Sequence, residues 1–91
     1  MENYYLYVLQ CSDSSYYCGI AKNVEKRLCE HNHTKKASKY VRARKPAELV
    51  YTSSALNKND ALSYEKKFKK LNRKQKENLI ASNINIQDFF N

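Results

Sequence analysis

The chain has 91 residues, which is enough for one compact domain, and no apolar stretch is long enough to span a membrane. Its 17 lysines and arginines outnumber 9 aspartates and glutamates, for a net charge of +8. This excess favours a polyanionic partner, nucleic acid rather than a membrane surface.

The three cysteines predict neither a disulfide framework nor a zinc site, because they are odd in number and lack C-x-x-C spacing. Cys11 and Cys18 could meet across a hairpin, but small buried thiols are the better interpretation. This usage fits a reducing compartment, and the first three residues do not resemble a signal peptide. We therefore expect a cytoplasmic protein.

The first half of the chain alternates short apolar runs with polar stretches. Aromatic and aliphatic residues predict strands, and Asn23 is a good N-cap for a first helix. In chain order the pattern predicts strands over 4–10 and 16–20, a helix over 24–31, a polar, basic loop over 33–40 and a strand over 48–52.

The second half is predicted to be helical. Asn57 or Asn59 caps a helix that runs to about Leu71, and Asn72 caps another over 73–81. The order β-β-α-β-α-α predicts an α+β fold, a three-stranded antiparallel sheet flanked by helices. We expect one domain over residues 1–82, followed by a tail over 83–91 that is apolar enough to dock.

Basic residues form two blocks without an intervening acid, between residues 35 and 45 and between 66 and 76. Solvated helix faces usually mix signs, so blocks of one sign favour phosphate contacts. We expect nucleic acid to be bound by Lys39, Arg42, Arg44, Lys66, Lys69, Lys70 and Arg73.

Arg27 lies on the same side of the first helix as Val24, Leu28 and His31. One interpretation is an arginine at the edge of the stripe whose head group reaches water. The other is a guanidinium that projects toward a site on the sheet and clamps a phosphate. His31, one turn further, would share that site or would simply be a histidine at a helix end.

Glu65 lies on the apolar face of the second helix, between Tyr64 and Phe68. A buried carboxylate needs a partner, because an unpaired buried charge is costly. A salt bridge with Arg27 would supply one, and a marginal, solvated position would remove the need. The third interpretation is an oxygen ligand for a divalent cation.

Tyr7 and Tyr17 share a face of the hairpin only in one kind of register, since side chains alternate along a strand. A three-residue loop of 13–15, with Ser12 paired to Tyr16, would place them together. A two-residue loop of 13–14 would separate them, and the sequence leaves both open.

These residues resemble the GIY-YIG nuclease domain, in particular its small stand-alone UPF0213 (YhbQ-like) proteins. The resemblance covers residues 4 to about 80 and rests on Tyr5-Leu6-Tyr7, Tyr17-Cys18-Gly19, Asn23-x-x-x-Arg27-Leu28-x-x-His31-Asn32 and Glu65. Tyr5 stands where the family name expects glycine and Cys18 where it expects isoleucine. Strand-forming residues fit both positions.

The resemblance implies a metal-dependent endonuclease that hydrolyses phosphodiester bonds, with DNA repair or processing as the expected setting. It implies catalytic roles for Tyr7, Tyr17, Arg27 and His31, a structural role for Gly19, and Glu65 as both a catalytic residue and the ligand of Mg²⁺ or Mn²⁺. The expected partner is nucleic acid, DNA before RNA and not membrane. The expected state is a monomer or weak homodimer, with specificity drawn from a separate partner.

Two other functions fit the charge equally well. A non-catalytic nucleic-acid-binding protein on the same scaffold would stack bases on its tyrosines. A structural partner within a ribonucleoprotein would also carry excess positive charge. Neither needs a carboxylate within a basic face, so Glu65 favours the enzyme.

Overall fold

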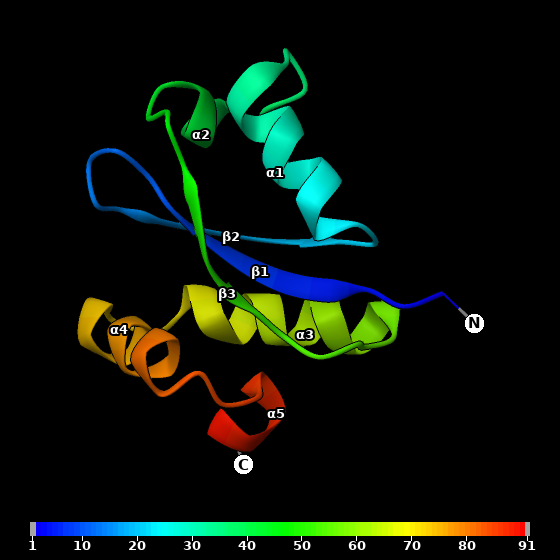
Figure 1. The fold of residues 1–91 in the computed structure, drawn as a ribbon. Coiled ribbons are helices and arrows are strands. Elements are labelled where there is room, and N and C mark those ends of the chain that lie inside the picture. Colours follow the sequence, from blue (N-terminus) through cyan, green and yellow to red (C-terminus); the bar gives the residue numbers. More distant parts are fainter. Residues whose placement is uncertain (1, 91) are drawn as a thin grey trace.

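The computed structural model describes residues 2–90, which form an α+β fold around one antiparallel sheet of strand order β2-β1-β3 (Figure 1). Helices cover both faces of the sheet, as the sequence predicted. The elements are β1 Tyr5–Gln10, β2 Tyr16–Ala21, α1 Val24–His33, α2 Lys39–Arg42, β3 Glu48–Thr52, α3 Lys58–Lys69, α4 Arg73–Ser82 and α5 Ile86–Phe89.

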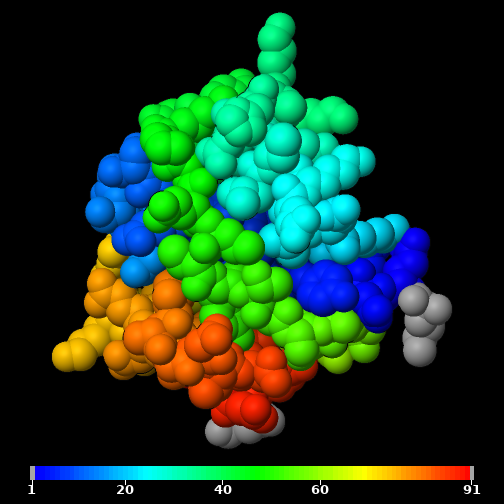
Figure 2. All heavy atoms as spheres, viewed as in Figure 1, coloured from blue at the N-terminus to red at the C-terminus, as the bar shows by residue number. Residues whose placement is uncertain are grey.

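Buried side chains form two separate clusters, one on each face of the sheet. One face packs under α1 and α2, and its buried residues are Tyr7, Leu9, Cys11, Val41 and Ala47. The space-filling view shows these helices, in cyan and green, on the side of the strands away from α4 and α5, in orange and red (Figure 2). This face of the sheet carries Tyr7 and Tyr17.

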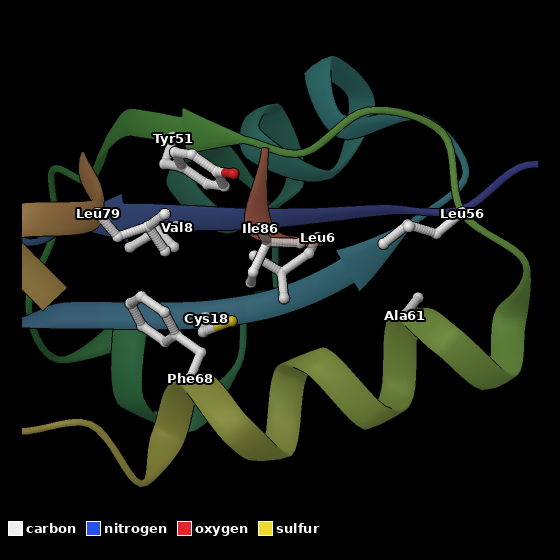
Figure 3. Packing of buried hydrophobic residues seen from close by; sticks show 9 residues of the cluster. All are labelled: Leu6, Val8, Cys18, Tyr51, Leu56, Ala61, Phe68, Leu79 and Ile86. Atoms are coloured by element: carbon white, nitrogen blue, oxygen red, sulfur yellow. The ribbon is translucent and has the colours of Figure 1, made fainter. Parts of the chain in front are cut away.

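The other face packs against the helices that follow β3, and its core includes Leu6, Val8, Cys18 and Phe68 (Figure 3). The segment expected to dock as a tail forms α5, and its Ile86 is fully buried in this core. The Tyr51 hydroxyl donates a hydrogen bond to the Ile84 carbonyl oxygen at 2.6 Å. Residues 84–89 therefore pack against this face of the sheet.

Helix starts follow the predicted caps. The side chains of Asn23, Asn57 and Asn72 each accept a hydrogen bond from a backbone N–H of the first turn. The prediction of an irregular segment over 33–40 is wrong at both ends, because α1 runs to His33 instead of His31 and Ser38 caps the short helix α2. Four residues show too little periodicity to be recognised in a sequence.

The β1–β2 hairpin has a register that places Tyr7 and Tyr17 on one face. Gln10 pairs with Tyr16, and the Cys11 N–H donates to the Ser15 carbonyl oxygen at 2.8 Å. The three-residue loop is therefore 12–14 and not 13–15. The predicted pairing of Ser12 with Tyr16 is wrong, because Tyr16 pairs with Gln10, two positions earlier on β1. Ser14 has a φ of 69°, the left-handed residue with which loops of this length commonly end.

Cys11 and Cys18 are buried free thiols, as predicted, and Cys29 is an exposed free thiol. Across residues 2–90, none of the helices combines the length and the apolar character that crossing a membrane requires.

Candidate active site

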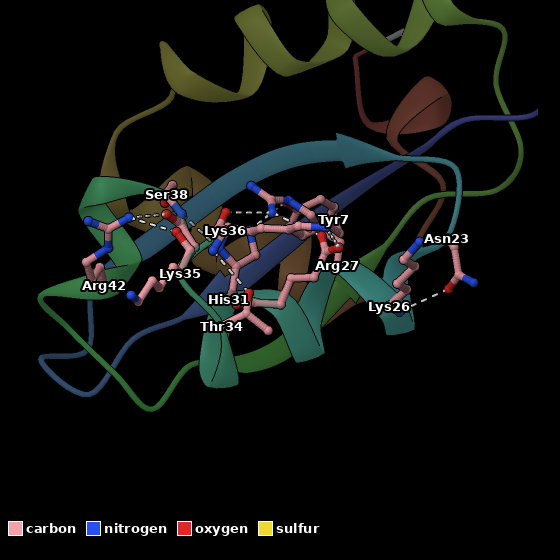
Figure 4. Close-up of polar contacts among 12 residues, drawn as sticks. Tyr7, Asn23, Lys26, Arg27, His31, Thr34, Lys35, Lys36, Ser38 and Arg42 are labelled. Carbon is pink, nitrogen blue, oxygen red and sulfur yellow. Dashed lines mark hydrogen bonds and ion pairs between the residues drawn. The ribbon is translucent and has the colours of Figure 1, made fainter.

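A buried hydrogen bond joins Tyr7 of β1 to His31 of α1. The Tyr7 hydroxyl oxygen lies 3.0 Å from His31 Nε2, and the two residues are 2% and 0% exposed. The Ser38 backbone N–H donates to His31 Nδ1 at 3.4 Å (Figure 4). Because Nδ1 accepts, a neutral His31 carries its proton on Nε2 and donates it to the Tyr7 oxygen. The Tyr7 O–H is then available to another acceptor.

Both groups of this bond are uncharged near neutral pH. Burial, followed by the positive charge of Arg27, lowers the pKa of His31 to about 4. Burial raises the pKa of Tyr7 well above its usual range, while the positive charge of Arg27 works against that rise. The Arg27 guanidinium thus lies near enough to the Tyr7 hydroxyl to act on its pKa, and Figure 4 shows the two side chains next to each other.

Gly19 of β2 makes room for the Tyr7 ring. The two residues pair across the hairpin, and a Cβ at position 19 would lie 2.5 Å from the Tyr7 hydroxyl oxygen and 2.7 Å from its ring carbon Cζ. Any side chain at this position would therefore displace the phenol from His31. Glycine is therefore required at position 19 because the Tyr7 phenol occupies the space that a side chain would fill.

Tyr17 packs beside this pair and is only partly buried. Its ring centroid lies 6.4 Å from that of Tyr7 and 5.3 Å from that of His31, the latter in an edge-on contact. Tyr40 of α2 stacks against it at 6.1 Å. Of the two phenols, Tyr17 is the one with access to solvent.

Arg27 is held in place through one nitrogen of its guanidinium group, Nη1. Its Nη1 donates to Glu30 Oε1 at 3.2 Å and to the Lys36 carbonyl oxygen at 2.9 Å, and 28% of its side chain is exposed. Within residues 2–90, the side-chain hydrogen bonds of Arg27 all come from Nη1, while its backbone N–H donates to the Asn23 carbonyl oxygen at 3.1 Å. The Nε–Nη2 edge is thus available as a two-pronged donor to an anion.

Glu65 lies across strand β2 from these four residues. Its Oε2 pairs with Lys69 Nζ at 3.5 Å, so the alternative of a salt bridge with Arg27 is wrong, since Arg27 pairs with Glu30. Burial, then the negative charge of Glu65, raises the pKa of Cys18 to about 12. Cys18 sits between Tyr17 and Gly19 and faces the opposite side, which places Glu65 under this edge strand.

Glu65 can serve as a single oxygen ligand for a divalent cation that takes its other ligands from outside the protein. The residues that the structure describes contain no group of three or more His, Cys, Asp or Glu side chains placed to share a metal. A single carboxylate fits Mg²⁺ or Mn²⁺ when water and substrate phosphate provide the other ligands. It does not fit a closed structural metal site.

The predicted nucleic-acid-binding residues fall into two groups. Lys39, Lys66 and Lys70 are exposed, while Lys69 is paired with Glu65. The three arginines also donate hydrogen bonds to backbone carbonyl oxygens of the protein. Arg42 donates to Lys35 and Ala37, Arg44 donates to Tyr40, and Arg73 donates to Ser14. Arg44 and Arg73 are also ion-paired with Asp13 and Glu77, while Arg42 is exposed and has no ion pair within residues 2–90.

Sequence reasoning missed Glu30, Ser38 and Tyr40. The i, i+3 spacing of Arg27 and Glu30 was a usable signal, because such pairs meet on a helix surface. No local signal identified Ser38 or Tyr40, which reach the site only through the packing of α2 against α1.

Comparisons with known proteins identify the family of this chain. The GIY-YIG catalytic domain family model matches residues 3–78. The UPF0213 protein YsiG of Lactococcus lactis is 46% identical over 90 residues, covering 98% of this chain and 86% of that protein. The solution NMR structure of the UPF0213 protein BH0048 from Bacillus halodurans has a TM-score of 0.55 at 39% identity, covering 87% of this chain and 83% of that chain. That of the protein EF2693 from E. faecalis has a TM-score of 0.61 at 38% identity, covering 90% and 86%. The chain therefore belongs to the GIY-YIG catalytic domain family, a nuclease family, and to its small UPF0213 proteins.

Proposed function

We propose that this protein is a metal-dependent endonuclease that hydrolyses phosphodiester bonds of nucleic acid, with DNA preferred over RNA. The observation that supports this most is the cluster of Tyr7, Tyr17, Arg27 and His31 on one face of the sheet, in a protein of net charge +8. Two phenols in contact with one buried imidazole, beside a guanidinium whose charge acts on that imidazole, are suited to binding a phosphate and moving a proton beside it.

Arg27 is proposed to bind the scissile phosphate. Its Nη1 is held by Glu30 and by the Lys36 carbonyl, which orients the Nε–Nη2 edge before substrate arrives. Negative charge grows on the phosphoryl oxygens as the bond to the leaving oxygen breaks. A preorganised guanidinium stabilises this charge more than it stabilises the ground state.

Tyr17 is proposed to take the proton of the attacking water. In this step the Tyr17 phenol first releases its own proton to solvent. The water oxygen then bonds to phosphorus as its proton passes to the Tyr17 oxygen, and the bond to the leaving oxygen breaks, with that oxygen taking a proton from solvent. Tyr7 is a weaker candidate because it is 2% exposed and its pKa is raised by burial. With its oxygen accepting from His31, Tyr7 instead donates its proton in a hydrogen bond toward the phosphate.

Glu65 is proposed to hold Mg²⁺ or Mn²⁺ beside the edge of β2. When bound, such an ion neutralises phosphate charge and lowers the pKa of coordinated water. Glu65 Oε2 lies 3.5 Å from Lys69 Nζ, so a bound ion would compete with this lysine for the carboxylate.

Flanking phosphates are proposed to contact the exposed Lys39, Lys66 and Lys70, with the three arginines adding charge. We further propose a cytoplasmic monomer or weak homodimer that acts in DNA repair or processing and takes its specificity from a separate partner.

A non-catalytic nucleic-acid-binding protein is the second candidate. One observation favours it: Glu65 is ion-paired and lies across β2, with no direct contact to Tyr17 or Arg27 among the described hydrogen bonds and ion pairs. In that case the phenols and lysines would bind a strand without cleaving it.

One experiment separates the two. Labelled DNA and RNA are incubated with the protein in Mg²⁺, Mn²⁺ or EDTA, beside Glu65→Ala and the matched control Glu77→Ala on α4. The nuclease proposal expects cleavage that EDTA and Glu65→Ala abolish, with binding largely intact. Binding without cleavage under every condition would support the second candidate and contradict the first.

A further inference from the structure

The Tyr17 hydroxyl has no hydrogen bond to any residue within 2–90, unlike the hydroxyl of Tyr7. The orientation of its ring is therefore set by packing alone. His31 contacts the ring edge-on, with centroids 5.3 Å apart, and Tyr40 stacks on it, with centroids 6.1 Å apart and planes 25° apart. The third aromatic neighbour, Tyr7, has its ring centroid 6.4 Å away. Tyr7 and His31 are buried and hydrogen-bonded to each other, so Tyr40 is the exposed neighbour of the three.

Tyr40 is itself held in place, although it is 36% exposed. The Arg44 guanidinium carbon lies 3.9 Å from the centroid of the Tyr40 ring. Arg44 Nη1 also donates to the Tyr40 carbonyl oxygen at 3.0 Å. One side chain thus restrains both the ring and the backbone of Tyr40.

Arg44 is tied in turn to the hairpin that carries Tyr17. Its Nε donates to Asp13 Oδ2 at 3.1 Å, and its carbonyl oxygen accepts from the N–H and the hydroxyl of Ser12, both at 3.0 Å. The contacts therefore form a closed path from the hairpin turn through α2 and back to strand β2.

We infer that Tyr40 is a positioning residue for Tyr17, and that the Arg44–Asp13 pair holds Tyr40 in the required orientation. This inference rests on the proposed nuclease function and adds residues to its site. Tyr40 does not touch the reacting atoms. It limits the rotation of the Tyr17 ring, so that the phenol oxygen stays where a proton can be transferred.

The alternative for Tyr40 is a stacking platform for a base of the substrate. A guanidinium centred 3.9 Å from the ring occupies a face that a base would need, and Tyr17 already packs against the same ring. A platform would leave an aromatic face open. The contacts of Tyr40 thus favour a role toward Tyr17 over a role toward substrate.

The test compares Tyr40→Ala, Tyr40→Phe and Asp13→Asn with Leu62→Ala, which removes an exposed apolar side chain of similar accessibility on α3. Steady-state cleavage of labelled DNA with Mg²⁺ gives kcat and KM for each. A positioning role predicts that Tyr40→Ala lowers kcat by about ten- to a hundredfold with KM nearly unchanged. Tyr40→Phe restores most of kcat, Asp13→Asn gives an intermediate loss, and Leu62→Ala is without effect.

A second measurement does not depend on activity. Nuclear Overhauser contacts between the rings of Tyr17 and His31 should persist in Tyr40→Phe and weaken in Tyr40→Ala. Unchanged contacts in Tyr40→Ala would overturn the positioning role, and so would a rise in KM at constant kcat, which would indicate substrate stacking. Absence of cleavage by the unmodified protein would instead contradict the proposed function, and the ring contacts would still decide whether Tyr40 holds Tyr17.

Discussion

The Tyr7 hydroxyl oxygen and His31 Nε2 meet at 3.0 Å inside the protein, where neither residue has meaningful contact with water. This contact joins the central strand β1 to helix α1 and sits at the centre of the proposed site. A buried polar pair of this kind is stabilising only while both partners are present, because a lone buried donor or acceptor is costly.

Breaking either half of this bond should destabilise the fold. Tyr7→Phe or His31→Phe leaves one buried polar group without its partner, at about 1–3 kcal/mol each. The double variant should lose less than the sum, because no orphaned group remains. Urea unfolding of the four proteins measures the coupling, and strictly additive losses would contradict the hydrogen bond.

Stability should depend on pH through His31. Burial, with help from Arg27, lowers its pKa from 6.5 to about 4, so between these values the unfolded chain binds more protons than the folded one. The free energy of unfolding is therefore fully maintained above pH 6.5 and falls as pH is lowered toward 4, by at most about 1.4 kcal/mol per pH unit from this group.

Urea unfolding of the protein and of His31→Gln at a series of pH values checks this. Glutamine can still hydrogen-bond Tyr7 but does not titrate, so the variant should have a flatter profile in this window. Parallel profiles for the two proteins would show that His31 is not the group responsible.

A methyl group at position 19 should act through Tyr7. In Gly19→Ala the new Cβ would lie 2.5 Å from the Tyr7 hydroxyl oxygen, and overpacking of this kind costs about 1–3 kcal/mol. The loss should shrink in a Tyr7→Leu background, where the phenol is absent. A loss of equal size in both backgrounds would mean that the glycine matters for its backbone instead.

Binding to DNA should weaken as salt rises, because exposed lysines displace counterions from phosphates. Lys66→Gln or Lys70→Gln should lower the salt slope by about one. Lys58→Gln, outside both basic blocks, is the control with the same charge change and should leave the slope unchanged. A salt slope unaffected by Lys66→Gln and Lys70→Gln would remove α3 from the binding surface.

Local signals predicted much of the fold but only part of the site. Asn23, Asn57 and Asn72 start their helices as expected, because an N-cap needs only its own turn. Strand β3 was likewise predicted at its observed ends.

Contacts between different helices and strands were harder to predict from the sequence. A one-residue change in the hairpin loop would have moved Tyr17 to the other face, so the shared face of Tyr7 and Tyr17 could not be deduced. Helical spacing put His31 beside Val24 and Leu28, yet its full burial depends on a partner from β1. Tyr40 reaches Tyr17 only through a tertiary stack.

The central claim is that Arg27 stabilises charge during phosphodiester cleavage. Single-turnover cleavage of labelled DNA with Mg²⁺, by the protein and by Arg27→Ala, tests it most directly. Lys26→Ala, an exposed neighbour on α1, serves as the control for lost charge. We expect Arg27→Ala to slow cleavage by about two to three orders of magnitude with little change in DNA binding, and equal rates for the two variants would contradict the account.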